Sequence, residues 1–235
     1  MRLRSGRAAT HQDGCLLILP WIDIAPSALK EARKQADGAG YAIDYQTADL
    51  NRVELPPNEF DLVVTQNCLH HVLQLEYLAE QIWQSLTPAG LLWIDDFIGE
   101  TQFQWTDKRL TFVNGVLSSL PEEYRFDRIN RRLLSQFQRK APGTLVSPFE
   151  AIRSGDIIPV FLRFFDVIEK HERNCMLHLV CPPGTRSAYA KDEAGKQMFE
   201  MLRTFDRLLI ETETLPPLGG QYLLRRKDAP CETDA

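Results

Sequence analysis

Asp23 is the residue whose setting most clearly predicts chemistry. It ends a short apolar run, Trp21-Ile22-Asp23, and Pro26 and Ser27 directly after it have the pattern of a helix start. In an open α/β sheet the carboxyl end of a strand faces the ligand crevice, where a carboxylate can accept hydrogen bonds from both hydroxyls of a ribose. An aspartate that only caps the following helix is the competing interpretation.

Further polar residues follow other apolar runs in the same way. Asp49 comes after the alternating segment 41–47, residues 65–67 (Thr-Gln-Asn) end the run that begins at Phe60, and Asp95 ends the run 91–95. Because the carboxyl ends of parallel strands meet at one edge of a sheet, we expect these residues to gather at the same crevice.

The pair His70-His71 is the candidate for proton transfer, because a histidine titrates near neutral pH. We select His71 and Asp95 as the catalytic candidates; the alternative is a histidine pair that packs internally in a loop before the next helix. The five histidines and five cysteines lack metal-ligand spacing, so no metal site is predicted. A nucleophile turn of the G-x-S-x-G type is also absent from the sequence.

The composition excludes several classes of protein. Hydrophobic residues make up 44% of the 235 residues, which is enough for a sizeable core. A net charge of −5 argues against bulk electrostatic binding of nucleic acid, and no apolar run is long enough to cross a membrane. The odd number of cysteines, five, is typical of free thiols in a reducing compartment. We therefore expect a cytoplasmic protein, although the basic start (Arg2, Arg4, Arg7) weakly resembles a transit peptide.

The elements that must position these residues alternate along the first hundred residues. The patterns predict a strand ending at Asp23, a helix over 27–36, strands over 41–47 and 60–65, a helix from Leu75 to Leu86 and a strand over 91–95. Alternation of this kind predicts an α/β fold with a mostly parallel, Rossmann-like sheet and helices on both faces.

The second half of the chain does not continue this alternation of strands and helices. Residues 101–140 have a helical pattern rich in aromatic and charged residues, and Ser147-Pro148-Phe149-Glu150 has the form of a capping box that opens a helix through Ile152. A strand over 165–169, a helix over about 188–212 and a closing strand over 221–225 are predicted to follow.

Five segments of this chain resemble the class I S-adenosylmethionine-dependent methyltransferases, in the order and spacing of that family. They cover about a third of the chain, within residues 21–99: Ile22–Leu29, Ala48–Leu50, Phe60–Val64, Cys68–Val72 and Leu86–Leu92. The resemblance implies S-adenosyl-L-methionine as cofactor and a small-molecule acceptor, with neither nucleic acid nor membrane as partner; the oligomeric state cannot be inferred from it.

The resemblance also implies roles for the strand-end residues. Asp23 matches the residue that binds the ribose, Ile24 the one that packs on the adenine, and Asp49 the one that accepts from the adenine amino group. Leu50 would offer a backbone amide nearby, and Thr65, Gln66 and Asn67 match the segment that lines the methionine end of the cofactor.

By the same resemblance, the chain is expected to consist of five regions. They are an atypical N-terminal segment (1–20), a partial cofactor-binding core (21–100), a helical cap that meets the acceptor (101–164), C-terminal strands and a helix that complete the sheet (165–227), and a tail (228–235).

One departure from the family is large. Its first strand and glycine-rich turn form the centre of the sheet and the floor under the methionine, and residues 1–20 contain only Gly6 and Gly14. We expect this strand to be missing or degenerate, with Leu16 to Asp23 forming the second strand. A truncated gene product, a degenerate relative or a domain completed by another chain would each explain the loss. The leading functional hypothesis is methyl transfer, impaired by this loss; the alternatives are a non-catalytic scaffold and, more weakly, a nicotinamide-binding domain.

Overall fold

The computed structural model describes residues 2–5, 10–11, 14–15, 20–139 and 147–230. Within these residues the chain forms two compact units. The first comprises residues 1–97, 149–171 and 221–235, and the second comprises residues 98–148 and 172–220. These units do not follow the five predicted regions, because residues 149–164 pack with the first unit; the assignment of a cap and an acceptor region stays a prediction.

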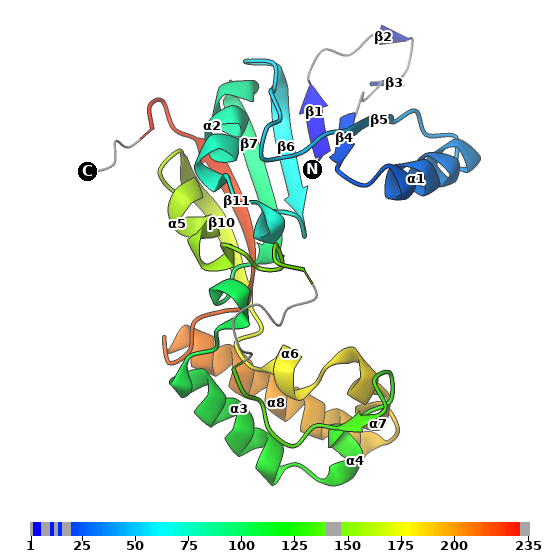
Figure 1. Cartoon of the computed structure of the whole chain (residues 1–235), viewed down its shortest axis with the longest axis vertical. Coiled ribbons are helices and arrows are strands. Elements are labelled where there is room, and N and C mark those ends of the chain that lie inside the picture. The colour runs from blue at the N-terminus through cyan, green and yellow to red at the C-terminus, as the bar shows by residue number, and fades with distance from the viewer. Residues whose placement is uncertain (1, 6–9, 12–13, 16–19, 140–146, 231–235) are drawn as a thin grey trace. The chain divides into compact units, whose positions relative to one another are not determined.

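The first unit is a mixed α/β structure built on a mostly parallel sheet, as predicted (Figure 1). Its strands are β1 (Arg2–Ser5), β4 (Pro20–Asp23), β5 (Asp44–Thr47), β6 (Phe60–Gln66), β7 (Leu86–Phe97), β10 (Phe165–Arg173) and β11 (Gly219–Arg226). Its helices are α1 (Pro26–Gly38), η1 (Leu69–His71), α2 (Leu75–Ser85), η3 (Ser154–Asp156) and α5 (Ile157–Phe161), and a small hairpin joins β2 (Thr10–His11) to β3 (Gly14–Cys15).

The strand order in the sheet is β10-β11-β7-β6-β1-β4-β5. β4 pairs with β5, and β6 with β7, in parallel. β1 lies between these two parallel pairs and runs antiparallel to both of its neighbours, with Arg2 opposite Trp21 and Val64. A short strand therefore fills the central place that the family's first strand would take, in the opposite direction.

The direction of β1 matters for the ligand edge. Because β1 is antiparallel, its amino-terminal end lies at the edge where β4 and β6 end. Among the described residues, no glycine-rich turn follows a central strand at that edge. β4 begins only at Pro20; the remainder of the predicted strand from Leu16 lies outside the described residues.

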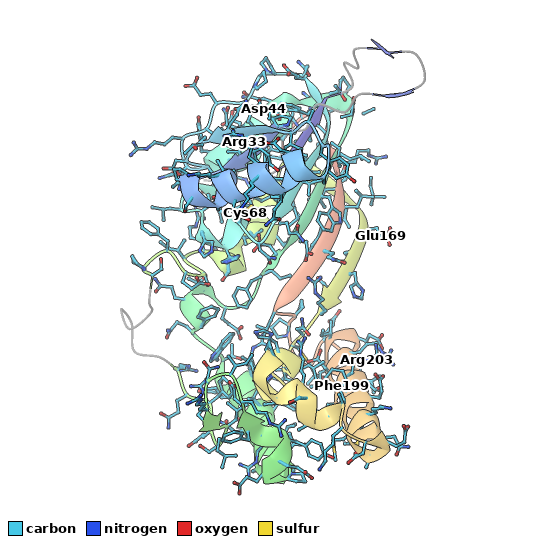
Figure 2. All side chains as sticks on the ribbon, turned by 90° about the vertical axis from the view of Figure 1, so that its right-hand side faces the viewer. Arg33, Asp44, Cys68, Glu169, Phe199 and Arg203 are labelled. Carbon is cyan, nitrogen blue, oxygen red and sulfur yellow. The ribbon has the colours of Figure 1, made fainter. Side chains whose placement is uncertain are left out.

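The core of the first unit sits between α2 and the two long parallel strands. α2 places its apolar stripe on β6 and β7, where the completely buried side chains are Val63, Leu78, Ala79, Ile82, Leu92 and Ile94. Each fully buried Leu or Ile stabilises the fold by about 1.5–3 kcal/mol. α1 makes a smaller cluster at the other edge, in which Leu29 and Ala36 pack with Tyr45 of β5. Arg33, labelled on α1 in Figure 2, donates to the backbone oxygen of Tyr45 at 3.1 Å.

The second unit is mainly helical. Its elements are η2 (Thr101–Phe103), α3 (Asp107–Ser119), α4 (Glu122–Arg125), β8 (Phe126–Asp127), β9 (Arg132–Leu133), α6 (Leu177–Val180), η4 (Pro183–Thr185), α7 (Arg186–Tyr189) and α8 (Glu193–Glu211). The predicted helical pattern of 101–140 is thus right for α3 and α4 and wrong after Arg125, where β8 and β9 form a hairpin. Trp105 and Tyr124 are buried within this unit, Tyr124 against the ring of Tyr189 at 4.7 Å.

The capping box at Ser147 does not open a helix. Residues 147–153 form successive turns, and Ala151 has a φ of 51°, which interrupts any helix there. Glu150 consequently does not occupy the third position of a helix, and its carboxylate is placed elsewhere, as described below. None of the described helices combines the length and apolarity needed to cross a bilayer.

Candidate functional site

The carboxyl ends of the parallel strands form one edge, as the sequence predicts. Asp23 at the end of β4 lies opposite Thr47 of β5, and Gln66 at the end of β6 lies opposite Asp95 of β7. The residues that follow these ends, including Asp49, therefore belong to the edge where ligands bind in open α/β sheets.

Asp23 is half-buried and has one carboxylate oxygen in use. Its Oδ1 accepts a hydrogen bond from the backbone N–H of Ala25 at 2.8 Å, and its backbone oxygen accepts from Ala48 at 3.2 Å. This bond fixes the direction of the carboxylate at the entrance to α1. Asp23 is not the N-cap residue of α1, because that position is Ala25, whose own side chain makes no capping hydrogen bond.

Asp49 is tied into a local network. Its Oδ1 accepts from the backbone N–H of Asn51 at 2.9 Å and from the Asn51 side chain at 2.8 Å, and these bonds hold the pKa of Asp49 below its ordinary value. Asn51 in turn accepts from the backbone N–H groups of Leu73 and Gln74 at the start of α2. Asp49 therefore fixes the loop after β5 to the start of α2.

The other predicted cofactor residues divide by exposure. Ile24 is 66% exposed, a fully open apolar surface beside Asp23, and Gln66 and Asn67 are exposed at the end of β6. Leu50 is half-buried, whereas Thr65 is completely buried, so the Thr65 side chain does not face a ligand. Asn67 has a φ of 48° and donates its N–H to the backbone oxygen of Asp95, which turns the chain sharply away from β6.

The strongest polar contact at this edge joins His70 and Asp96. Nδ1 of His70 lies 2.5 Å from Oδ1 of Asp96, whose side chain is completely buried. Oδ2 of Asp96 accepts from the backbone N–H groups of Cys68 and Leu69 at 2.9 and 2.8 Å, so the carboxylate also holds the start of η1. Cys68, labelled in Figure 2, lies in this loop, and desolvation raises the pKa of its thiol to about 11.

This arrangement fixes one histidine nitrogen and leaves the other available. A neutral His70 that donates its Nδ1–H to Asp96 presents an unprotonated Nε2, and the carboxylate stabilises the imidazolium that forms when Nε2 accepts a proton. The His70 side chain is 12% exposed, so the ring is well packed yet reachable. The pair can therefore act as a general base.

The two residues selected from the sequence are placed less favourably for proton transfer. Asp95 is 8% exposed, and one of its carboxylate oxygens accepts from Gln221 of β11 at 3.2 Å. His71 is exposed, and its Nδ1 lies 3.3 Å from the backbone oxygen of Phe149. Their catalytic roles stay predictions.

A distant segment completes the surroundings of the histidines. Glu150 places one carboxylate oxygen 3.8 Å from Nε2 of His70 and the other 3.8 Å from Nδ1 of His71. Its loop is held in place by the N–H of Ile152, which donates to the backbone oxygen of His70 at 3.0 Å. Arg153 anchors the same loop, because its two terminal nitrogens donate to the two carboxylate oxygens of Glu76 on α2 at 2.7 and 2.8 Å.

The sequence places Asp95 and Asp96 together at the ligand-facing end of their strand, but our selection took Asp95 and His71 instead of their neighbours Asp96 and His70, and it gave Glu150 only a capping role. A signal for Asp96 existed: side chains two apart on a strand share a face, and Asp96 shares that of Leu92 and Ile94, which is the buried one. A carboxylate there requires hydrogen-bond donors, and the loop before α2 is the segment able to provide them. For Glu150 there was no comparable signal, because the capping-box pattern pointed to another use of its side chain.

A comparison with protein families finds one match in the first part of the chain. Residues 8–94 match the profile of a family described as "Methyltransferase domain". The match covers less than half of the chain and indicates that this segment is similar to methyltransferase domains. The matched residues include β4, β6 and most of β7, whereas Asp95, Asp96 and Glu150 lie beyond the matched segment.

A curated relative matches the same part of the protein. A "Probable polyketide synthase 26" from Dictyostelium discoideum is 33% identical over 78 residues, which are 31% of this chain and 3% of that relative. The chain thus spans only a small fraction of that relative's length.

Solved structures of methyltransferases are similar over most of the chain. A putative sarcosine dimethylglycine methyltransferase from Galdieria sulphuraria matches with a TM-score of 0.49 at 15% identity, over 89% of this chain and 69% of that one. A phosphoethanolamine N-methyltransferase 2 from Haemonchus contortus in complex with S-adenosyl-L-methionine matches with a TM-score of 0.47 at 14% identity, over 89% and 43% of the two chains.

Proposed function

We propose that this chain transfers a methyl group from S-adenosyl-L-methionine to a small-molecule acceptor that loses a proton in the reaction. The observation that carries this proposal is the contact of His70 with the buried Asp96, 2.5 Å between Nδ1 and Oδ1; His70 lies in the segment that matches the methyltransferase model, and Asp96 lies two residues beyond it. An enzyme that only positioned an amine for transfer would need no such oriented base.

The cofactor would bind along the strand ends. Asp23 has an oxygen besides the one bonded to Ala25, which suits a ribose hydroxyl, and the exposed Ile24 suits the adenine face. Asp49 and Leu50 would meet the adenine edge, and the backbone of residues 65–67 the methionine end. S-adenosyl-L-methionine supplies an electrophilic methyl group on a sulfonium.

His70 would accept the acceptor's proton on Nε2 while the acceptor's oxygen or carbon attacks the methyl group. The proton would thus move to the imidazole, and the bound cofactor would supply the methyl group and be released as S-adenosylhomocysteine. General base catalysis of this type contributes about 10²–10⁴-fold to a rate. Asp96 keeps the Nδ1–H tautomer and stabilises the imidazolium, as the aspartate does in a hydrolase triad. Geometry supports His70 over His71 for this role, because only His70 is held by a buried carboxylate.

The relative named as a polyketide synthase suggests an acceptor class. Polyketide chains contain carbons between two carbonyl groups, whose C–H protons are acidic enough for a histidine to remove. We therefore propose a β-keto acyl compound as the acceptor, and we expect a protein in the cytoplasm that engages neither nucleic acid nor membrane.

The test is methyl transfer from labelled S-adenosyl-L-methionine to three acceptors: a β-keto acyl thioester, a phenol and a primary amine. We expect product with the thioester, and a loss of 10²-fold or more in His70→Gln with cofactor affinity unchanged. His178→Gln, an exposed histidine of the second unit, is the matched control. Transfer to the amine alone, with His70→Gln as active as wild type, would refute the base.

A specific observation favours a second candidate, a non-catalytic scaffold. β1 fills the centre of the sheet in the antiparallel direction and brings no glycine-rich turn to the ligand edge within the described residues. A scaffold would fold normally and give no heat with S-adenosyl-L-methionine, whereas an enzyme must bind it.

A further inference from the structure

His70, His71 and Glu150 form a cluster that the reaction proposed above does not fully use. One ligand atom from each residue lies within 4.8 Å of the other two, and the two carboxylate oxygens of Glu150 lie 3.8 Å from Nε2 of His70 and from Nδ1 of His71. Two imidazoles and one carboxylate are a ligand set that suits Zn²⁺ and similar divalent transition metals.

The surroundings of His70 point independently to a metal. A histidine that binds a metal almost always donates its other ring N–H to a carboxylate or carbonyl, which fixes the tautomer and makes the free nitrogen a better ligand. His70 has this partner in Asp96, buried and 2.5 Å from Nδ1, so Nε2 is the free nitrogen and it lies beside Glu150.

The distances are compatible with a small contraction. Zinc ligands lie about 2.0–2.2 Å from the metal, so two of them in a tetrahedron are separated by about 3.4 Å. Each 3.8 Å contact, which involves a different oxygen of Glu150, must then close by about 0.4 Å, and the other separations, at most 4.8 Å, must close by at most about 1.4 Å. The required movement falls on the exposed side chains, since His71 and Glu150 expose 45% and 36% of their surface and His70 only 12%.

The cluster is held together by contacts that do not depend on a metal. The Ile152 N–H binds the His70 carbonyl, and Arg153 pairs with Glu76 on α2. Three protein ligands on such a frame leave the fourth tetrahedral position open on the exposed side, as in zinc sites that bind water or a small ligand.

We propose that His70, His71 and Glu150 bind one Zn²⁺ ion, and that the bound ion inhibits methyl transfer. The metal would occupy Nε2 of His70, which must be free to accept a proton, so the two uses of this nitrogen exclude each other. The binding site stands on the geometry alone; only the inhibition rests on the proposed function.

The first experiment measures zinc binding directly. Titration of the metal-free full chain with ZnCl₂ in a calorimeter should give one site, and Glu150→Gln and His71→Gln should each weaken the affinity at least tenfold. Glu169→Gln on β10 and His178→Gln on α6 are matched controls that should bind as the wild type does, because both residues are exposed outside the cluster. Absence of a site, or equal affinity in Glu150→Gln and wild type, overturns the proposal.

The second experiment measures the ratio of methyl-transfer rates with and without saturating zinc. The rate with zinc divided by the rate without zinc should be about 0.1 or less in the wild type, which is at least a tenfold inhibition. The same ratio should stay near one in Glu150→Gln at the same zinc concentration. Zinc that binds at one site yet leaves this ratio at one, or raises it, overturns the inhibition. A chain with no transfer activity at all defeats the proposed function, and the calorimetric result still decides the metal site.

Discussion

Replacing Asp96 by Asn tests the chemistry of this site with little change in shape. The carboxylate accepts four hydrogen bonds: Oδ2 from the N–H groups of Cys68 and Leu69, and Oδ1 from the Phe97 N–H and His70 Nδ1, at 2.5–2.9 Å. An amide has only one oxygen. Placing it at the Oδ2 position preserves both bonds to η1, and the new NH₂ group then faces His70 and the Phe97 N–H.

This orientation of the new amide costs the least free energy, because His70 can change its tautomer. If the proton of His70 moves to Nε2, then Nδ1 accepts from the new NH₂ group, and the Phe97 N–H loses its bond to Asp96. Loss of this part-buried hydrogen bond costs at most about 1–3 kcal/mol, well below the 5–15 kcal/mol stability of a domain, so Asp96→Asn should fold. With its proton on Nε2, however, the neutral imidazole cannot act as a base. The aspartate-to-asparagine change in a serine protease triad has this consequence and lowers turnover about 10⁴-fold.

Three measurements together check this prediction. Urea unfolding followed by circular dichroism should place Asp96→Asn about 1–3 kcal/mol below wild type. Long-range ¹H–¹⁵N correlation spectra should show the proton on Nδ1 of His70 in the wild type and on Nε2 in the variant. Turnover should fall by two to four orders of magnitude with cofactor affinity unchanged. A folded variant with the Nε2–H tautomer and wild-type turnover would refute the reasoning.

Three further substitutions test the frame around the site and the second unit. Hydrogen bonds from Arg153 lower the pKa of Glu76 to about 2 from 4.5, so the pair stabilises the fold above pH 4.5 and progressively less as the pH falls toward 2. Urea unfolding should show Glu76→Gln less stable than wild type at pH 7, by a small amount because both groups are partly exposed, with the difference shrinking by pH 3. Gly184→Ala should lower the melting temperature or prevent folding, since its Cβ would lie 1.7 Å from Asp127 Oδ1; an unchanged melting temperature contradicts the packing. Arg109→Met should cost about 3–5 kcal/mol in urea, because this fully buried guanidinium donates to a carboxylate and two backbone carbonyls; a loss below 1 kcal/mol contradicts that role.

Much of the sheet could be predicted from the sequence, because buried parallel strands and amphipathic helices leave strong local patterns. The strand 60–65 and the helix from Leu75 appear in the structure as β6 and α2 within one residue of their predicted bounds. β1 could not be predicted, because four residues with two arginines carry no strand signal, and their pairing depends on the gap between β4 and β6.

The sequence predicted the correct edge of the sheet for the site, but it did not identify the side chains that form the His70–Asp96 contact. Neighbouring residues on a strand point to opposite faces, so the choice between Asp95 and Asp96 depends on which face α2 and η1 cover. The choice between His70 and His71 depends in turn on the position of Asp96. Glu150 reaches the histidines through a series of turns with a positive φ at Ala151, which the capping-box pattern does not encode.

The central claim is that the strand ends bind S-adenosyl-L-methionine through Asp23, and calorimetric titration of the full chain with this compound tests it most directly. We predict one site in the wild type and an affinity about 10–100-fold lower in Asp23→Asn, since the asparagine keeps the bond to Ala25 and loses a charged acceptor worth about 1.5–3 kcal/mol. Asp37→Asn, an exposed aspartate on α1, should bind as the wild type does. No heat at millimolar ligand, or equal affinity in Asp23→Asn and wild type, would contradict the claim.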